Sequence, residues 1–507
     1  MTDVVVGVDA GTTTVKAVVM DARGEVVHSA SRRLAVSRPN PGWAEQDMDE
    51  TWQAVAAVLR EAVSAAGKVT ITAVGVTGQG DGAWLLDDAG RPARPAILWL
   101  DGRATDIVTA WEKDGRAQAV FDATASVLFP GALPPLLDWL QENEPHVLAR
   151  ATHHLNCKDW IRYRLTGSVQ TDPSEASRTY LDVETGQYAD RLLLALGHDR
   201  HVRLLPPVVP SASVGGTVTG TAAAETGLPA GIPVVVGAVD TSATAAGLGL
   251  HAPGAAYAVL GTTAFYAVLS DHVVRRDEPM GFVLPAGLTD GWVTAMSPMA
   301  AAPNLDWVVS ALGMNVGEWR TVEAEAEAAG PGAGGVLYLP YISESGERAP
   351  FVDPHASAGF VGVRPTTTRG HLLRAVYEGV ALTMADCLAE LPDADVVKLA
   401  GGASSAFFCQ VIADIIGRPV LRPATDEFGA RGVAAAALAA AGLVTSVEAG
   451  LAAVSRDGQL FTPRAEHRSL HATQLETFRA LRNALAPTWP ALRRLGHLAT
   501  TKELCHP

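Results

Sequence analysis

Two short Gly-Thr-Thr sequences carry residue types suited to holding an anion. The first is Gly11-Thr12-Thr13 and the second is Gly261-Thr262-Thr263, and each follows an apolar run. Such a turn leaves backbone N–H groups and hydroxyls free to point at one spot, which forms an anion cradle without a helix start. Phosphate is the natural occupant. The two turns therefore predict a site for the phosphates of a nucleotide.

Charged residues lie near the first turn, and one more ends a later apolar run. Asp9 is a carboxylate able to hold hydrated Mg²⁺, and Lys16 is a cation for phosphoryl oxygens. Asp240 follows the apolar residues 234–239, and a carboxylate at the carboxyl end of a strand is well placed for chemistry. The alternative for Asp240 is a helix N-cap for residues 241–247.

Two further segments combine glycine with polar and aromatic side chains. They are residues 78–82, with Gln79 and Asp81, and residues 99–103, with Trp99, Asp101 and Arg103. Carboxylates accept hydrogen bonds from hydroxyls, Gln and Arg donate them, and a Trp face covers C–H surface, so this mixture suits a polyhydroxylated ligand. The alternatives are a surface ion pair in the second segment and a plain turn in the first.

A glycine pair in the second half, Gly401-Gly402, follows an apolar run at residues 397–400. Without Cβ atoms it permits close approach of a ring or a ribose to the backbone, although a simple turn would use the same residues. We expect the base end of a nucleotide in this half of the chain.

The elements that must position these residues alternate between strands and helices. The patterns predict a hairpin over residues 4–8 and 15–20, a helix over 48–66, a strand over 71–76, a second hairpin over 255–270 and a C-terminal helix over 475–485 ended by Pro487. The alternation indicates an α/β architecture, and the repeated strand, Gly-Thr-Thr and strand pattern indicates a duplicated fold. Residues 206–231 are expected to form loops before a domain boundary near residue 250.

Other nucleotide motifs do not account for the chain. There is no GxxxxGK[ST] sequence, which argues against a Walker-type NTPase. A GxGxxG sequence occurs at residues 330–335, but it follows a predicted helix (321–329) and precedes a predicted strand (336–339). A Rossmann turn has the opposite order, so these glycines are interpreted as a loop and a dehydrogenase is not favoured.

Composition limits the partners. The 507 residues are 48% hydrophobic and carry a formal net charge of -15, which predicts a well-packed globular protein without affinity for nucleic acid or anionic membrane. No signal peptide is recognised, the alanine-rich residues 432–444 are expected to form a buried helix, and we expect a cytoplasmic protein. The four cysteines are expected to be reduced and mostly buried. The sequence leaves open whether the protein forms a homodimer.

Several blocks, taken in order, resemble the FGGY carbohydrate kinases. They are DAGTTT from Asp9, GWAEQD, TGQGDG, WLDGR, the residues around Asp240, LGTT, SGERAPFVDPHASAGFVG, RAVYEGVA and AGGASS. The resemblance implies a duplicated, actin-like (ribonuclease H-like) ATPase fold. Its N-terminal domain would cover residues 1–250 and its C-terminal domain 251–507, with sugar and ATP meeting in the cleft between them.

The resemblance also implies roles for individual residues. Asp240 would be the general base. The residues expected to bind ATP are Gly11, Thr12, Thr13, Lys16, Gly261, Thr262, Thr263, Gly401, Gly402 and Ser405, Asp9 and Asp240 are expected to hold Mg²⁺, and Gln79, Asp81, Asp101, Arg103 and Asp240 are expected to bind the substrate.

The loop containing Gly80-Asp81 bears on the choice of substrate. Glycerol kinases carry Arg-Glu at this place and D-xylulose kinases carry Met-His, whereas this loop and the segments CKDW and TDPSEAS are similar to those of the erythritol kinase branch. The resemblance implies phosphorylation of a terminal hydroxyl of a short linear polyol, with erythritol favoured. A kinase for L-xylulose or D-xylulose is the alternative. Two functions other than catalysis also remain as alternatives: an actin-like, nucleotide-dependent interaction protein and a sugar sensor.

Overall fold

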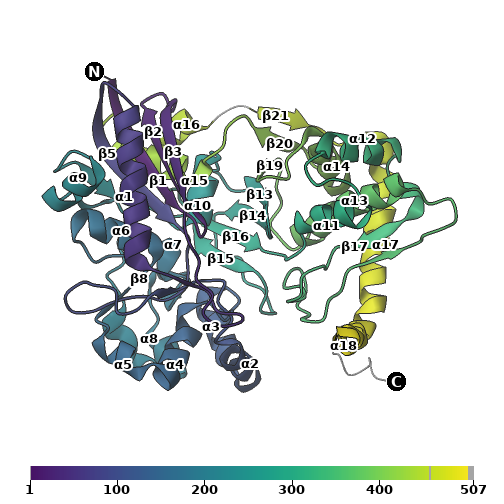
Figure 1. The fold of residues 1–507 in the computed structure, drawn as a ribbon, viewed down its shortest axis with the longest axis horizontal. Coiled ribbons are helices and arrows are strands. Elements are labelled where there is room, and N and C mark those ends of the chain that lie inside the picture. Colours follow the sequence, from purple (N-terminus) through teal and green to yellow (C-terminus); the bar gives the residue numbers. More distant parts are fainter. Residues whose placement is uncertain (1, 456–457, 501–507) are drawn as a thin grey trace. The chain divides into compact units, whose positions relative to one another are not determined.

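The computed structural model describes residues 2–455 and 458–500 and divides into two compact units (Figure 1). Unit 1 comprises residues 1–253, 269–293 and 425–456, and unit 2 comprises residues 254–268, 294–424 and 457–507. The first crossing between the units, at 253/254, lies close to the boundary expected near residue 250. Two later segments, however, belong to the unit formed by the N-terminal half.

Unit 1 is built on a six-stranded sheet of order β11-β12-β5-β1-β2-β3. The strands are β1 (Thr2–Ala10), β2 (Thr14–Asp21), β3 (Val26–Arg33), β5 (Val69–Gly78), β11 (Val214–Thr217) and β12 (Pro233–Val235). β1 and β2 form the predicted antiparallel hairpin, while β1, β5 and β12 run parallel. The carboxyl ends of these three parallel strands therefore meet at one edge of the sheet.

Both faces of this sheet are covered by helices, as the uninterrupted burial of residues 4–8 of β1 requires (Figure 1). Val4 and Val6 pack in the cluster that contains α1 (Met48–Ala65), whereas Val5 packs with α15 (Phe428–Ala440). A Cβ on Gly7 would lie 2.0 Å from the Ala430 carbonyl oxygen. Glycine at position 7 thus allows a helix from late in the sequence to pack directly on the first strand.

The remaining elements of unit 1 are mostly short. The helices are α2 (Thr105–Asp114), α3 (Arg116–Thr124), α4 (Leu133–Asn143), α5 (Pro145–Arg150), α6 (Cys157–Thr166), α7 (Pro173–Ala176), α8 (Asp190–Leu196), η1 (Asp199–Leu204), α9 (Gly220–Thr226), α10 (Asp240–Gly247) and α16 (Val447–Val454). The strands are β4 (Glu45–Gln46), β6 (Trp84–Leu86), β7 (Ala96–Ile97), β8 (His153–Leu155), β9 (Leu181–Asp182), β10 (Gln187–Tyr188) and β15 (Phe282–Pro285).

A second sheet has seven strands in the order β15-β16-β14-β13-β19-β20-β21. Its further strands are β13 (Ala256–Leu260), β14 (Ala264–Ser270), β16 (Trp292–Met296), β19 (Val397–Ala400), β20 (Val420–Pro423) and β21 (Gly458–Phe461). β13 and β14 form an antiparallel hairpin, and β13 pairs in parallel with β19. This repeats the arrangement of β1, β2 and β5, which confirms the predicted duplication.

Unit 2 also contains the longest helix of the described chain, α13 (Arg369–Leu388). Its other elements are α11 (Pro303–Ala311), α12 (Trp319–Ala328), η2 (Ala333–Gly335), β17 (Leu337–Leu339), β18 (Gly359–Val361), α14 (Ala406–Ile416), η3 (Ala465–His467), α17 (Arg468–Leu485), η4 (Ala486–Thr488) and α18 (Trp489–Thr500). The glycines of residues 330–335 lie between α12 and β17, which is the predicted order and not that of a Rossmann turn.

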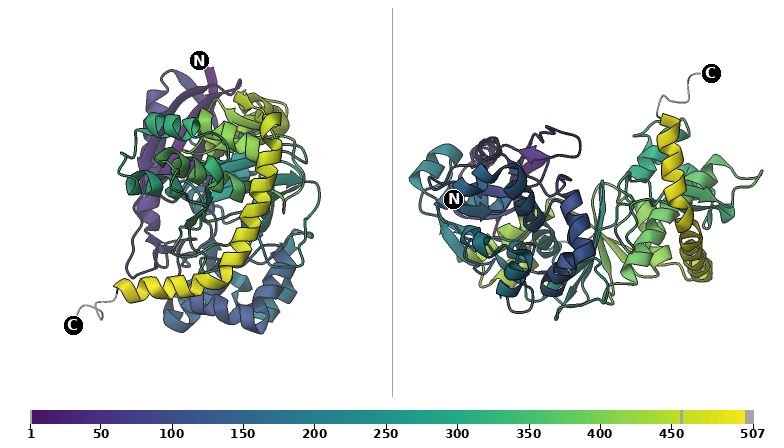
Figure 2. Two further views of the ribbon diagram at one scale, coloured as in Figure 1. Left: turned by 90° about the vertical axis from the view of Figure 1, so that its right-hand side faces the viewer. Right: turned by 90° about the horizontal axis from the view of Figure 1, so that it is seen from below.

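The C-terminal helix packs on its own unit, as expected. The Gln474 amide of α17 donates a hydrogen bond of 2.8 Å to Glu378 of α13. α17 ends at Leu485, and Pro487 lies in the short turn η4 that leads into α18 (Figure 2).

Two local expectations were wrong. Residues 206–231 were expected to form loops, but they contain β11 and α9, because the Thr219 hydroxyl caps α9 by accepting from the Ala222 N–H. The strand expected over residues 234–239 ends at Val235. Gly237 then adopts a left-handed φ of 78°, and a Cβ there would lie 1.7 Å from the Val76 carbonyl oxygen.

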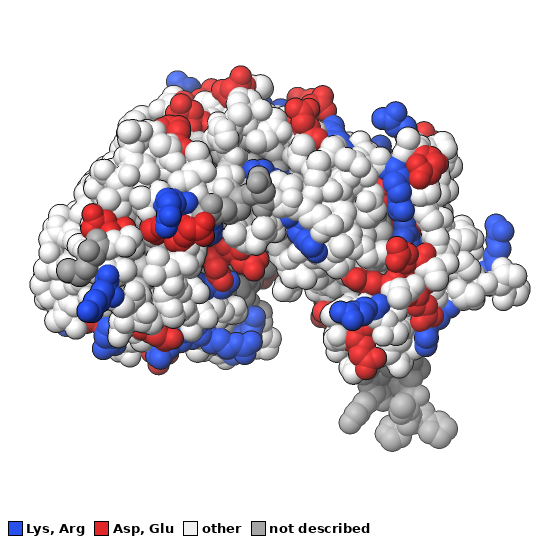
Figure 3. Space-filling view, turned by 90° about the horizontal axis from the view of Figure 1, so that it is seen from above, with Lys and Arg blue, Asp and Glu red and all other residues white. Residues whose placement is uncertain are grey.

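The surface and the cysteines agree with the composition. Acidic and basic side chains are interspersed on the face in Figure 3. Cys157, Cys387 and Cys409 are free and buried, while Cys505 lies outside the described residues. Within residues 2–455 and 458–500, no helix combines the length and apolar character needed to cross a bilayer.

Candidate active site

Three carboxylates gather where the parallel strands of unit 1 end. Asp9 lies near the end of β1, Asp81 follows β5, and Asp240 follows the segment after β12. Asp9 is in register with Thr77, and Gly78 forms a parallel bridge with Val239, so these chain ends are adjacent.

The electrostatics of this cluster, which we call the carboxylate cluster (Asp9, Asp81 and Asp240), reflect burial and mutual repulsion. Burial, followed by repulsion from Asp9, raises the pKa of Asp240 to about 7, with Asp81 adding a smaller repulsion and the Thr241 N–H opposing it. Burial also raises the pKa of Asp9 to about 6, against the attraction of Lys16. A carboxyl group that titrates near neutrality is suited to accepting a proton.

Asp240 is the first residue of α10, and Val239 is the N-cap. The alternative interpretation of Asp240 as the N-cap is therefore wrong in detail. One carboxylate oxygen of Asp240 accepts a hydrogen bond of 2.7 Å from the Thr241 N–H. The helix thus begins at the carboxylate, whose negative charge is favourable beside the free N–H groups of a first turn.

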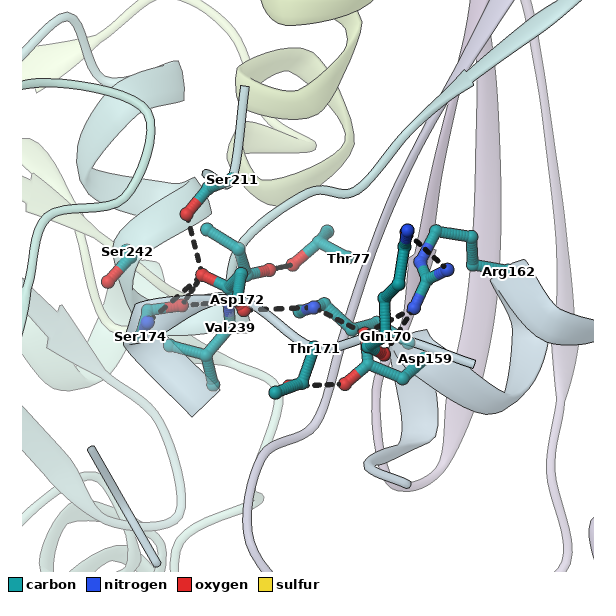
Figure 4. Close-up of polar contacts among 12 residues, drawn as sticks. Thr77, Asp159, Arg162, Gln170, Thr171, Asp172, Ser174, Ser211, Val239 and Ser242 are labelled. Carbon is teal, nitrogen blue, oxygen red and sulfur yellow. Dashed lines mark hydrogen bonds and ion pairs between the residues drawn. The ribbon is translucent and has the colours of Figure 1, made fainter. Parts of the chain in front are cut away.

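A buried polar network supports the backbone just before Asp240 (Figure 4). The Val239 N–H donates to the Ser174 hydroxyl (2.9 Å), and this hydroxyl donates to an Asp172 carboxylate oxygen (2.6 Å). Ser211 donates to the same oxygen (2.6 Å), and the Lys158 ammonium lies 2.9 Å from the other oxygen of Asp172. Because each of these polar groups is buried, the network fixes the position of Val239 and of the residue that follows it.

The first Gly-Thr-Thr turn is only partly free to bind an anion. The Gly11 N–H is used inside the turn, where it donates to the Thr14 carbonyl (3.0 Å). The Thr12 hydroxyl donates to Gln79 (3.0 Å) and accepts from the Trp99 indole N–H (2.9 Å). Within the described part of the chain the N–H groups of Thr12 and Thr13 make no hydrogen bond, and they remain available to an oxyanion.

Lys16 lies on β2 just beyond this turn. Its ammonium is 3.0 Å from a carboxylate oxygen of Glu427, and its side chain is 40% exposed. A cation held by one carboxylate at this exposure can still turn toward a phosphate.

The second Gly-Thr-Thr turn borders a pocket of about 510 Å³ in unit 2. The residues that line the pocket are Leu260, Gly261, Ala302, Leu305, Asp306, Trp319, Glu323, Tyr377, Gly402, Ala403, Ser404, Ser405 and Phe408. Aromatic rings, small residues and a few acceptors are a lining that fits a flat heterocycle with hydroxyl or amino groups.

The backbone at the glycine pair Gly401-Gly402, which lies at this pocket, could not accommodate a larger residue at position 401. Gly401 has a φ of 102°, and a Cβ on it would lie 2.4 Å from the Leu260 carbonyl oxygen. This approach places the loop after β19 against the residue that precedes the second turn. The Ser405 hydroxyl is the N-cap of α14 and accepts from the Phe408 N–H (3.1 Å), so it is already engaged.

Three predicted substrate residues make internal contacts. Gln79 is 2% exposed, and its amide donates to Gln46 while accepting from Thr12. Asp101 and Arg103 form a fully buried ion pair of 2.8 Å. Both oxygens of Asp101 accept from Arg103, and the second also accepts from the Ala44 N–H. These groups are thus engaged within the protein, and their contact with substrate stays a prediction.

Sequence reasoning missed two residues beside the carboxylate cluster. Arg178 donates through Nε to a carboxylate oxygen of Asp81 at 3.3 Å. Glu175 is buried with both carboxylate oxygens unpartnered, and burial raises its pKa well above the usual value. Both lie in or beside the quoted segment TDPSEAS, but nothing in its spacing indicates a contact with position 81.

No group of three or more His, Cys, Asp or Glu side chains in residues 2–455 and 458–500 is arranged to hold a metal ion by itself. A Mg²⁺ ion that arrives with nucleotide needs fewer protein ligands, since phosphates and water complete its octahedron. Asp9 and Asp240 are close enough for Asp9 to add to the effect of burial on the pKa of Asp240, and two carboxylates are donors of the chemistry that such an ion prefers.

Comparison with known proteins identifies the class to which this fold and site belong. Residues 4–247 match the N-terminal domain, and residues 256–441 the C-terminal domain, of the FGGY family of carbohydrate kinases. The chain belongs to this family, and is a carbohydrate kinase whose family membership implies the use of ATP.

Individual relatives agree in activity class but differ in substrate. The chain is 33% identical to an erythritol kinase of Brucella abortus, over 97% of this chain and 98% of that protein. It is 32% identical to a xylulose kinase of Escherichia coli, over 95% of this chain and 99% of the relative. These two identities are too close to choose between a polyol and a ketose.

Solved structures show the same fold. A xylulose kinase from Rhodospirillum rubrum superposes with a TM-score of 0.88 at 30% identity, covering 96% of this chain and 99% of that one. A gluconate kinase from Lactobacillus acidophilus gives a TM-score of 0.91 at 22% identity, covering 97% and 100%. The expected actin-like ATPase fold of the FGGY kinases is thereby confirmed.

Proposed function

We propose that this kinase transfers the γ-phosphate of ATP to a terminal hydroxyl of a short linear polyol, with erythritol as the favoured substrate. The observation that supports this most is the carboxylate cluster, in which one member, Asp240, has a pKa near 7 and begins a helix. Phosphoryl transfer to an alcohol needs a base that accepts the hydroxyl proton as the oxygen attacks phosphorus.

In this proposal Asp240 accepts that proton, and its burial keeps it basic enough to do so. Asp9 and Asp240 would hold Mg²⁺, which supplies charge neutralisation on the phosphates when bound. The N–H groups of Thr12 and Thr13, with Lys16, would contact phosphoryl oxygens.

The adenosine moiety is assigned to the pocket of about 510 Å³ in unit 2. Gly402 would allow a ring or ribose to approach the backbone, and Thr262 and Thr263 would contact phosphates at the border of that pocket. Ser405 is left to its capping role. An adenosine in this pocket is consistent with the mixture of aromatic and acceptor side chains.

The choice of a polyol rests on Asp81 and on the similarity to the erythritol kinase. A carboxylate accepts hydrogen bonds from hydroxyls, and the cation paired with Asp81 is Arg178, whose charge Asp81 neutralises. A ketopentose kinase is the second candidate, because the xylulose kinases are similar to nearly the same degree.

The test is coupled release of ADP with Mg-ATP against erythritol, D-threitol, glycerol, xylitol, D-xylulose and L-xylulose, with controls lacking acceptor. Selective turnover of erythritol supports the proposal. A preference for a ketopentose transfers the assignment to the second candidate, and no turnover of any acceptor contradicts both.

A further inference from the structure

In the loop that carries Asp81, neighbouring residues leave no room for a side chain at the position before or after Asp81. A Cβ on Gly80 would lie 2.6 Å from a Val239 methyl carbon and 3.2 Å from a Glu175 carboxylate oxygen, and a Cβ on Gly82 would lie 2.3 Å from the Ile97 carbonyl oxygen. Asp81 itself adopts a φ of 60°, which is uncommon for a residue other than glycine. Any donor that complements Asp81 must therefore come from another segment.

Arg178 supplies that donor, just beyond α7. Its Nε hydrogen-bonds to one oxygen of Asp81 at 3.3 Å, while the other oxygen of Asp81 is buried without a partner. Within residues 2–455 and 458–500 the two terminal nitrogens of Arg178 make no hydrogen bond. Arg178 therefore has two terminal nitrogens that can still donate hydrogen bonds, and Asp81 has one oxygen that can still accept one.

Two aromatic rings hold the guanidinium in place. The central carbon of Arg178 lies 4.5 Å from the ring centre of Phe282 and 5.5 Å from that of Phe129. The Arg178 side chain is 9% exposed and that of Asp81 is 14% exposed. A guanidinium fixed between rings presents its N–H groups in a defined plane, and little rotational freedom is lost when it binds a ligand.

We propose that Arg178 is a specificity-determining residue that, with Asp81, binds a hydroxyl-bearing part of an uncharged polyhydroxylated substrate, and that this pair discriminates against sugar acids. The inference rests on the proposed function and adds a residue and a charge selectivity to it. A substrate hydroxyl donates to the free oxygen of Asp81, and a hydroxyl oxygen accepts from the terminal nitrogens of Arg178.

The selectivity against acids follows from charge. Asp81 already neutralises Arg178, and the loop of Asp81 lies against Val239, the residue before the Asp240 carboxylate: a Cβ on Gly80 would be 2.6 Å from a Val239 methyl carbon. A substrate carboxylate beside this pair would meet two carboxylates and one guanidinium, whereas an uncharged hydroxyl finds both a donor and an acceptor.

The first experiment compares Arg178→Lys with the wild type on its best acceptor from the panel. Lysine keeps the charge beside Asp81 but loses the planar pair of terminal nitrogens. We expect KM for the acceptor to rise about 10-fold or more, the scale of a hydrogen bond to a charged group, with KM for ATP within about 2-fold. The matched control is Arg116→Lys, whose guanidinium also lies over a ring (Trp111, 4.9 Å) and pairs with Asp114, and which should leave both KM values unchanged.

Deoxy acceptors separate recognition from mere neutralisation of Asp81. In the wild type, an analogue that lacks one internal hydroxyl should have a lower kcat/KM than the full acceptor. For the analogue that lacks the hydroxyl bound by Arg178, the ratio of these two kcat/KM values should fall to about 1 in Arg178→Lys. An unchanged pattern of losses, or equal increases in both KM values, would overturn the role of Arg178 while leaving the kinase activity intact.

A measurement on the wild type alone keeps the proposal testable if the variant does not fold. The ratio of kcat/KM for the best neutral acceptor to that for the corresponding aldonic acid should exceed about 10. Equal or better turnover of the acid overturns the inference. Absence of turnover with every neutral acceptor instead contradicts the proposed function itself.

Discussion

The two Gly-Thr-Thr hairpins share a backbone arrangement but differ in their surroundings. Each hairpin pairs its first strand in parallel with a later strand, β1 with β5 and β13 with β19. Around the first turn lie Asp9 and Lys16, whereas the corresponding positions of the second hairpin are Val259 and Tyr266. The same fold element is therefore flanked by charged side chains in unit 1 and borders a mostly uncharged pocket in unit 2.

The difference extends to how each turn is supported. The first turn is tied by the Thr12 hydroxyl to Gln79 and Trp99, while the central residue of the second, Thr262, is exposed. Duplication supplied the strand, turn and strand element twice, and the residues packed around each copy differ. Substitutions in the two units can test whether the copies also differ in role.

The largest effect is expected at the carboxylate cluster of unit 1. Asp240→Asn should lower kcat by about 10²-fold to 10⁴-fold, because an amide cannot accept the proton of the attacking hydroxyl. Steady-state kinetics should show KM values for both substrates within a few-fold of wild type. The control is Asp106→Asn, which alters an exposed carboxylate in the first turn of α2. A kcat near that of the wild type would remove Asp240 from its proposed role.

The next effect is expected in unit 2. Gly401→Val places a side chain against the Leu260 carbonyl at a positive φ, and such overpacking costs about 1–3 kcal/mol. We expect KM for ATP to rise about 5-fold to 100-fold while KM for the acceptor changes little. Gly359→Ala, where a Cβ meets open space, is the matched control. If the acceptor KM rises as much as that for ATP, the loop after β19 does not serve nucleotide binding alone.

A paired substitution compares the two turns directly. Thr12→Val leaves Gln79 without its donor and Trp99 without its acceptor, so the free energy of unfolding should fall by about 1–3 kcal/mol. Thr262→Val, at an exposed position, should change it by less than about 0.5 kcal/mol. Urea unfolding of both variants measures the difference. Equal losses would show that the turns are supported alike.

The smallest effect is a pH dependence of stability without Mg²⁺ or nucleotide. The pKa of Asp240 is about 7 in the folded protein against 3.8 ordinarily, so between about pH 4 and pH 7 the folded state retains a proton that the unfolded state releases. Stability from this group is therefore present at low pH and is lost as the pH rises. Asp240→Asn should melt higher than the wild type at pH 8, by roughly 2–4 °C for each 1 kcal/mol relieved, and the gain should vanish toward pH 4.

The control for this titration comes from the other unit. Asp306→Asn, at an exposed position lining the unit 2 pocket, should give no gain that depends on pH. A constant offset between Asp240→Asn and the wild type from pH 4 to pH 8 would show that burial and repulsion by Asp9 do not raise the pKa of Asp240 in the folded protein.

Most of the architecture could be predicted because it depends on local patterns. The β-branched runs of β1 and β2, the helical spacing of apolar residues in α1, and the repeat of strand, turn and strand at β13 and β14 are visible in the sequence. The predicted ends of elements were wrong where tertiary contacts override local preference. At Gly237, for example, the chain has left the strand and passes close to the Val76 carbonyl. Likewise, nothing local indicates that α15 packs on Gly7 of the first strand.

The site divides in the same way. Asp9 and Asp240 were selected from apolar runs that precede them, and Asp81 from a glycine-rich polar segment, although the strand before Asp240 ends at Val235. The parallel strands bring the three residues to one edge of the sheet. Asp101 and Arg103 were chosen by residue type, but only the fold shows that they form a buried ion pair. Burial and pairing determine whether a charged group is available to a ligand, and neither can be read from residue type alone.

By itself, the sequence determined the class of this protein, a carbohydrate kinase of the FGGY family with an actin-like fold, because its motifs and its repeated strand, turn and strand pattern are local. Only the tertiary structure decided which charged groups stay available, and it brought Arg178 to Asp81 from a segment 97 positions away in the chain. The physical reason is that periodicity and turn chemistry depend on a few neighbouring residues. The pairing of buried charges depends instead on which distant segments of the chain pack against each other and so remove those charges from water.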